Sequence, residues 1–174
     1  IINVQNKNDN KCFIWSILAK LHPAKDHSER LSNYKDYEKE LNIEGLQFPM
    51  KVNDILKFEK QNTAISINVF GLQNPQNHQS IVPIYHSTFT DRENTINLLY
   101  LEQEENTHYC LIKNLASLLY DNSSQQVCPR CLSRFSKSKD LQKHINYCSQ
   151  NKIAKAIMPT EEEKILKFEK HHYK

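Results

Sequence analysis

The first regular pattern along the chain is a run of apolar residues at helical spacing, from Cys12 to Leu21. Apolar side chains that recur every three or four residues line one face of a helix. Asp9 or Asn10 lies where a side-chain oxygen would cap the first turn, and Pro23 stops the helix from continuing. The pattern therefore predicts a packed helix that begins at a cysteine.

Two further helices are predicted before residue 62. The segment 28–41 carries leucine and tyrosine side chains along one stripe, with Ser28 as a cap, and 53–61 has a shorter helical pattern.

The period changes at Ile65, after which alternating and branched residues predict strands. The expected strands cover 65–70 and 81–86, followed by a hairpin made of 95–103 and 107–113 around an acidic turn. Residues 114–120 then have the pattern of a short helix.

Helices followed by antiparallel strands predict an α+β domain over residues 1–122, in which helices pack on an antiparallel sheet. Residues 123–150 form a separate cysteine-rich unit, joined to the first by the linker composition of 121–126. Residues 151–174 read as a charged tail toward a following domain, and the start at Ile1 without methionine favours a piece of a longer protein.

Composition narrows the class of protein. Hydrophobic residues make up 39% of the chain, charged residues 25%, and the net charge is +3, as in a soluble globular protein. No apolar run reaches the ~18 residues that cross a bilayer, so no membrane partner is expected. With Gly45 and Gly71 as its only glycines, the chain cannot build a glycine-rich phosphate loop.

The strongest local signal is a metal-ligand pattern near the C-terminus. Cys128 and Cys131 form a CxxC pair, and His144 and Cys148 follow at positions that share one helix face. Phe135 and Leu141 occupy the core positions of a ββα finger. The pattern predicts a C2HC zinc finger with a structural Zn²⁺. An odd cysteine count with this cluster favours a reducing compartment, cytoplasmic or nuclear.

Nucleic-acid binding by this finger is a second possibility. The positions that face base edges in DNA-reading fingers are occupied by Lys137, Asp140 and Lys143. Arg130 and Arg134 are placed where they could contact the phosphate backbone. Because one finger covers only ~3 bp, a role in stabilising the fold or in binding protein is the favoured reading.

Cys12 and His108 form the candidate catalytic pair. A thiol in the first turn of a helix meets the positive end of the helix dipole, which predicts a lowered pKa. His108 opens an apolar strand of the sheet expected to pack against that helix. A thiol protease needs such an imidazole to take the thiol proton. Buried structural roles for both residues are the competing reading, as they are for Cys110.

The third catalytic position is less determined by the sequence. Asn106 lies two residues before His108 on the same strand face, at ~6.6 Å, whereas Asn114 lies six residues away. The oxyanion would be bound by the Cys12 N–H together with a side-chain amide of Asn10 or Gln5.

Several motifs resemble the N-terminal region of the large polymerase-bearing proteins of Maverick/Polinton-type DNA transposons. They are KCFIWSILAKLHP, the block 37–71, HYCLIKNLASLL, the CxxC finger with KHINYC, and the closing KFEKHHYK. That region in turn is similar to papain-like cysteine peptidases, most nearly to viral tegument-like deubiquitinases, in which a helix-start cysteine is followed later by Asp-x-His.

The resemblance implies Cys12 as nucleophile, His108 as base and Asn106 as the orienting residue, with asparagine where that family has aspartate. The expected function is a thiol-dependent isopeptidase, a hydrolase that acts as a deubiquitinase on ubiquitin or a ubiquitin-like protein. Two alternatives stay open: a cysteine peptidase that processes a polyprotein, and a non-catalytic module that binds nucleic acid or a replication complex.

Overall fold

The computed structural model describes residues 1–7, 9–73, 80–103, 106–120 and 124–150. The predicted charged tail, 151–174, lies outside the described residues. In the described part of the chain, no helix combines the length and the apolar character needed to cross a membrane.

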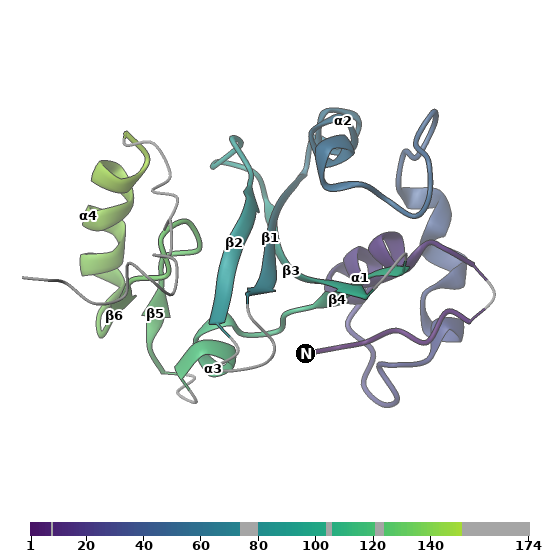
Figure 1. The fold of residues 1–174 in the computed structure, drawn as a ribbon, viewed down its shortest axis with the longest axis horizontal. Helices are drawn as coiled ribbons and strands as arrows, with labels where there is room; N and C mark the ends of the chain where they lie inside the picture. The colour runs from purple at the N-terminus through teal and green to yellow at the C-terminus, as the bar shows by residue number, and fades with distance from the viewer. Residues whose placement is uncertain (8, 74–79, 104–105, 121–123, 151–174) are drawn as a thin grey trace, which may run out of the picture.

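A four-stranded sheet forms the centre of the larger unit (Figure 1). Its strands are β1 (Ile65–Gln73), β2 (Ser80–His86), β3 (Asn94–Gln103) and β4 (Asn106–Leu111), in the order β2-β1-β3-β4. The four strands match the four that the alternating pattern predicts.

The sheet is mixed, which corrects the expectation of an antiparallel one. β1 pairs antiparallel with β2 and parallel with β3, while β3 and β4 pair antiparallel. Since β2 returns the chain to the end of the sheet where β1 starts, residues 87–93 lead directly into β3 on the other side of β1. A parallel neighbour then needs no crossover helix.

The helices also match the predicted positions, with one correction. α1 spans Cys12–Leu21, α2 spans Ile55–Gln61 and α3 spans Leu115–Tyr120. A single turn of 3-10 helix, Val52–Asp54, precedes α2.

The predicted α-helix over 28–41 is wrong, because the chain there forms two 3-10 helices, Leu31–Asn33 and Lys35–Glu40. Tyr34 separates them with φ −122°, outside helical geometry. Its fully buried ring and the hydrogen bond from its hydroxyl to the Ser28 carbonyl, at 2.7 Å, hold the chain in this bend.

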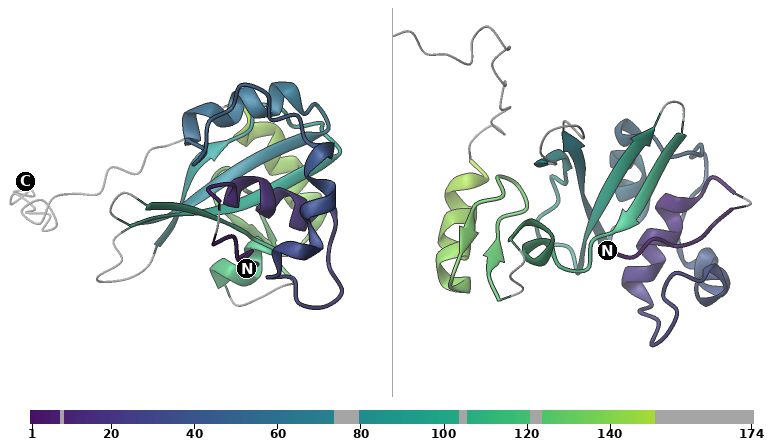
Figure 2. Two further views of the ribbon diagram at one scale, coloured as in Figure 1. Left: turned by 90° about the vertical axis from the view of Figure 1, so that its right-hand side faces the viewer. Right: turned by 60° about the horizontal axis from the view of Figure 1, so that its bottom comes forward.

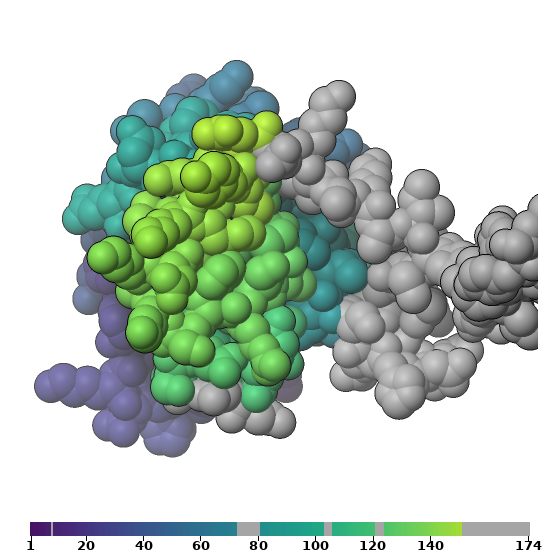
Figure 3. All heavy atoms as spheres, turned by 90° about the vertical axis from the view of Figure 1, so that its left-hand side faces the viewer, coloured from purple at the N-terminus to yellow at the C-terminus, as the bar shows by residue number. Residues whose placement is uncertain are grey.

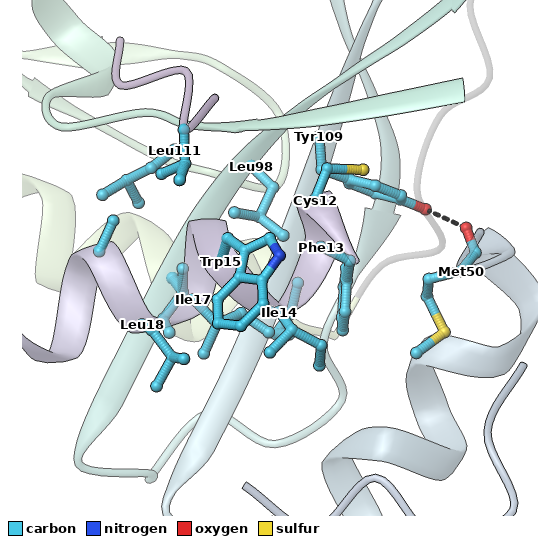
Figure 4. Packing of buried hydrophobic residues seen from close by; sticks show 14 of the residues in the cluster. Cys12, Phe13, Ile14, Trp15, Ile17, Leu18, Met50, Leu98, Tyr109 and Leu111 are labelled. Atoms are coloured by element: carbon cyan, nitrogen blue, oxygen red, sulfur yellow. Dashed lines mark hydrogen bonds between the residues drawn. The ribbon is translucent and has the colours of Figure 1, made fainter. Parts of the chain in front are cut away.

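The main core lies between α1 and one face of the sheet (Figure 4). The Phe13 ring meets the rings of Phe58 and Tyr109 edge-on, each at 5.2 Å between centroids. The Tyr109 hydroxyl donates a hydrogen bond to the Met50 carbonyl, which satisfies the one polar atom of that buried ring. These contacts fix the orientation of α1 relative to β4.

The opposite face of the sheet carries a second apolar cluster, built on Phe70, Leu99 and Cys110. Val127 and Leu132 of the cysteine-rich unit pack against this cluster. The cysteine-rich unit therefore covers part of the sheet, and Figure 3 shows it from that side.

The cysteine-rich unit has the predicted ββα order. Its strands are β5 (Gln126–Val127) and β6 (Arg134–Phe135), which pair antiparallel, and its helix is α4 (Ser138–Cys148). Among its described residues only Cys128 is buried. With so little apolar area removed from water, this unit needs another source of stability.

We expect the protein to lose stability as the pH rises above about 9. Burial raises the pKa of the Cys110 thiol from 9.0 to about 11, so the folded state holds this proton more tightly than the unfolded state. A group of this kind stabilises the fold below its unfolded pKa, and the stabilisation is lost between about pH 9 and 11. At about 1.4 kcal/mol per pKa unit, Cys110 accounts for roughly 2 to 3 kcal/mol.

Urea unfolding at pH 7 and pH 10.5, for wild type and Cys110→Ala, measures this effect. The drop in unfolding free energy should be smaller in the variant. An equal drop in unfolding free energy in the two proteins would show that the Cys110 thiol is not the cause of the pH dependence.

Candidate metal centre and cysteine–histidine site

Four ligand atoms of the cysteine-rich unit converge on one point. The sulfur atoms of Cys128, Cys131 and Cys148 and a ring nitrogen of His144 all lie within 4.8 Å of one another. Cys128 Sγ is 3.9 Å from Cys148 Sγ, and Cys131 Sγ is 3.1 Å from His144 Nε2. The predicted ligand set is therefore together in space.

Two local structures hold these ligands. The Cys128 N–H donates to the Ser133 carbonyl at 2.9 Å and the Leu132 N–H donates to the Cys128 carbonyl at 2.8 Å, which closes a tight knuckle around the CxxC pair. Leu132 has φ +63° at this turn. On α4, His144 and Cys148 are one turn apart and face the knuckle.

The observed spacing fits a tetrahedral metal ion. Zinc–sulfur bonds of ~2.3 Å and zinc–nitrogen bonds of ~2.0 Å give ligand separations of about 3.8 and 3.5 Å in a tetrahedron. Three thiol sulfurs with one imidazole are the donors of a closed structural site, with no position left for water. The cluster can hold a metal ion of this kind.

The Cys131 thiol has a lowered pKa within this cluster. For Cys131, burial raises the pKa, but hydrogen bonds from Ser133 and the neighbouring ligands outweigh it and bring the pKa to about 7. One of the four ligands is thus close to the thiolate form that binds metal.

A cavity of about 190 Å³ lies between the cysteine-rich unit and the sheet. Asn68 and His86 of the sheet and Arg130 of the knuckle are among its lining residues. Arg130 therefore faces the sheet, and Arg134 lies over the Tyr120 ring at 5.4 Å. By contrast, the predicted base-facing residues Lys137, Asp140 and Lys143 are all exposed.

Cys12 is the first residue of α1 and is 4% exposed. Burial raises the pKa of its thiol, which outweighs backbone hydrogen bonds from Tyr109, Phe13 and Cys12 itself, and the nearby Asp9 carboxylate raises it further. The lowered pKa expected at a helix start is therefore wrong. Local N–H groups do favour the thiolate here, but desolvation has the larger effect.

Asp9 organises the chain just before α1. Its carboxylate accepts hydrogen bonds from the Lys11 N–H at 2.8 Å and from the indole N–H of Trp15 at 3.0 Å. The cap position itself is Lys11, and no side chain caps it. Asp9, one of the two predicted caps, thus lies two residues before the cap position and orders the chain that leads to Cys12.

The outer edge of β4 is covered by α1 and the N-terminal segment (Figures 1 and 2). Backbone N–H of Tyr109 donates to the Cys12 sulfur, and the Tyr109 carbonyl accepts from the Ser16 hydroxyl at 2.9 Å. Leu111 exchanges two backbone hydrogen bonds with Ile2, at 2.8 and 2.9 Å. The sulfur of Cys12 therefore lies at the edge of the sheet.

His108 directly precedes Tyr109 on β4. Strand alternation points its side chain with Cys110, toward the face opposite Phe13 and α1. Its Nε2 lies 2.7 Å from Asn3 Oδ1, and burial lowers the pKa of its ring. In the described residues no hydrogen bond joins the His108 ring to Cys12.

Cys12, the first residue of α1, nevertheless contacts β4 at the residue that follows His108. The nitrogen that donates to Cys12 belongs to Tyr109, and it is bonded to the carbonyl carbon of His108. The structure thus places the buried thiol beside the backbone next to His108, at the edge of the sheet.

The other predicted site residues have other surroundings. Asn106 is exposed at the end of the hairpin, opposite Gln103. Asn114 accepts a hydrogen bond from the Ser117 N–H at 2.9 Å, which caps the start of α3. Gln5 and Asn10 are exposed, and Gln5 forms a backbone bridge to Arg30.

Sequence reasoning missed Asn3 as the partner of His108. The signal that could have found it is the alternation in Ile2–Asn3–Val4, in which a polar residue lies between two apolar ones, as in a short edge strand.

In comparisons with known proteins, no family model, no curated protein and no solved structure matches the chain.

Proposed function

We propose that residues 1–122 form a thiol-dependent isopeptidase of the papain-like kind that cleaves the C-terminus of ubiquitin or a ubiquitin-like protein. Cys12 is the nucleophile and His108 the base. The observation that supports this most directly is the hydrogen bond from the Tyr109 backbone to the Cys12 sulfur, since it brings a helix-start thiol to the residue next to His108. A thiol and an imidazole on adjacent elements are the minimum that this chemistry needs.

The raised pKa of Cys12 defines how the thiol must be activated. At neutral pH it is protonated, so His108 has to accept its proton as the sulfur attacks the carbonyl carbon. Burial keeps the His108 pKa low, which leaves the imidazole neutral and able to accept that proton. The imidazolium then protonates the departing lysine amine, and water hydrolyses the thioester and releases the carboxylate.

The start of α1 supplies stabilisation for the oxyanion. The N–H groups of Cys12 and Phe13 lie close to the sulfur. In the proposed mechanism they would donate hydrogen bonds to the carbonyl oxygen as it develops negative charge. Because Cys12 is 4% exposed, a substrate carbonyl reaches its sulfur only after local opening around the start of α1.

For the cysteine-rich unit we propose a structural zinc finger with Cys128, Cys131, His144 and Cys148 as ligands. Its role is to hold the second face of the sheet through Val127 and Leu132. Zinc supplies the stability that this unit cannot draw from its own small core.

The test of the isopeptidase is labelling of the zinc-loaded chain with a ubiquitin whose C-terminus carries a thiol-reactive warhead. We expect an adduct on Cys12, located by mass spectrometry, that is absent in Cys12→Ala. Cys110→Ala is the matched control, because Cys110 is also a buried thiol with a raised pKa but packs in the other cluster. A wild-type chain that forms no adduct, or one that reacts equally in Cys12→Ala, would disprove the isopeptidase proposal.

The same experiment with a peptide warhead separates the two peptidase proposals. Labelling of Cys12 by a peptide but not by ubiquitin would favour processing of a polyprotein.

A non-catalytic nucleic-acid module is the second candidate function, favoured by the exposure of Lys137 and Lys143 on α4. Binding to duplex DNA that weakens with salt, and weakens further in Lys137→Ala with Lys143→Ala, would support it. Binding that is unchanged in this double variant would count against it.

A further inference from the structure

We infer that Asn3 is the residue that orients the imidazole of His108, in the role that the sequence suggests for Asn106. The inference rests on the proposed function and names a positioning residue for it. Its direct observation is the 2.7 Å contact between Asn3 Oδ1 and His108 Nε2.

The chain holds Asn3 in place from both sides. Ile2 and Val4 are 8% and 2% exposed and belong to the main core. Ile2 is also tied to Leu111 by two backbone hydrogen bonds. Between two such anchors, alternation turns the side chain of Asn3 to the face on which His108 lies.

The contact determines which ring nitrogen of His108 carries the proton. An amide oxygen only accepts hydrogen bonds, so Nε2 must carry the proton in this pairing. Nδ1 is then the unprotonated nitrogen of the neutral ring. It is the only ring atom left that can take the proton of Cys12.

Asn106 has no comparable arrangement. Like Asn3 it is exposed, but among the described residues it has backbone pairing with Gln103 and no hydrogen bond to the His108 ring. Strand spacing predicted Asn106 as the neighbour of the His108 ring. The observed contact instead comes from Asn3, 105 residues away in the sequence.

Two measurements on the zinc-loaded chain test the inference. The first is the ¹⁵N NMR signature of the His108 ring, which reports the tautomer without any need for activity. The second is the rate of labelling by the ubiquitin warhead as a function of pH. The variants are Asn3→Ala, Asn3→Asp and Asn106→Ala.

We expect the Nε2–H tautomer in wild type and a mixture of tautomers in Asn3→Ala. The labelling rate of Asn3→Ala should fall by about 10- to 100-fold, a part of the ~10² to 10⁴ that general base catalysis contributes. Asn3→Asp should retain the tautomer and much of the rate. Its negative charge should also raise the His108 pKa and move the acid limb of the pH profile to higher pH.

The outcomes separate this inference from the proposed function. A wild-type protein that forms no adduct overturns the isopeptidase and, with it, the catalytic role of Asn3. An active protein in which Asn3→Ala changes neither the His108 signals nor the rate overturns the inference about Asn3 alone. The same holds if Asn106→Ala lowers the rate more than Asn3→Ala does.

Discussion

Replacing His108 with alanine should reduce the rate of acyl transfer by about 10²- to 10⁴-fold, the usual contribution of a general base. The expected loss is large because the Cys12 thiol has a raised pKa and is protonated at neutral pH, so the helix start cannot activate it unaided. A nucleophile that depends on a base loses nearly all its reactivity with the base.

The pH dependence of wild type follows from the same two groups. The rate should rise with pH as His108 loses its proton, with a midpoint below the ordinary histidine value of 6.5, because burial lowers the His108 pKa. The rate should then stay level until the Cys12 thiol ionises, because burial raises the pKa of this thiol above its ordinary value of 9.0. In His108→Ala only the upper rise, that of the thiol itself, should remain.

Single-turnover labelling by the ubiquitin warhead between pH 5 and pH 10 measures both effects. His22→Ala is the matched control, because His22 stacks on Tyr37 and pairs with Glu40, away from β4. A His108→Ala rate within threefold of wild type, or a wild-type profile with only a thiol titration above pH 9, would contradict the role of His108.

Removing the metal should unfold the cysteine-rich unit and destabilise the sheet to which it is attached. Structural zinc contributes an apparent ~10 to 16 kcal/mol to small fingers, far more than the core of this unit can supply. Its unfolding also removes the cover of Val127 and Leu132 from the second cluster. The loss of these two contacts should cost the rest of the chain roughly 2 to 4 kcal/mol.

For a chain of this size that cost corresponds to a melting temperature lower by roughly 5 to 15 °C. Thermal unfolding with and without chelator, together with the zinc content by native mass spectrometry, measures it. Cys131→Ser should reproduce the effect of the chelator, and Lys139→Ala, an exposed change on α4, should not. One bound zinc per wild-type chain whose removal leaves the melting temperature unchanged would show that the finger does not support the sheet.

The elements that sequence reasoning predicted well are those determined by neighbouring residues. The helical spacing from Cys12 and the alternation after Ile65 gave α1 and the four strands close to their observed bounds. The four metal ligands were found the same way, because the CxxC turn and the spacing of two residues on one helix face are local geometry.

Patterns were less informative where a distant contact competes with local preference. The stripe over 28–41 has helical spacing, yet the buried ring of Tyr34 bends the chain into two 3-10 helices. The parallel pairing of β1 with β3 was also hidden, because strand patterns give the faces of a strand but not its neighbours.

The sequence by itself determined that a cysteine begins a packed helix, that a histidine lies on an apolar strand, and that four ligands can close around one metal ion. Only the tertiary structure decided the protonation state of the cysteine and the hydrogen-bond partner of the histidine. Desolvation by the surrounding core raises the pKa of Cys12 against the effect of its helix. The pairing of Ile2 with Leu111 brings Asn3 to His108 across 105 residues. Both depend on which segments pack together, and that information is spread over the whole chain.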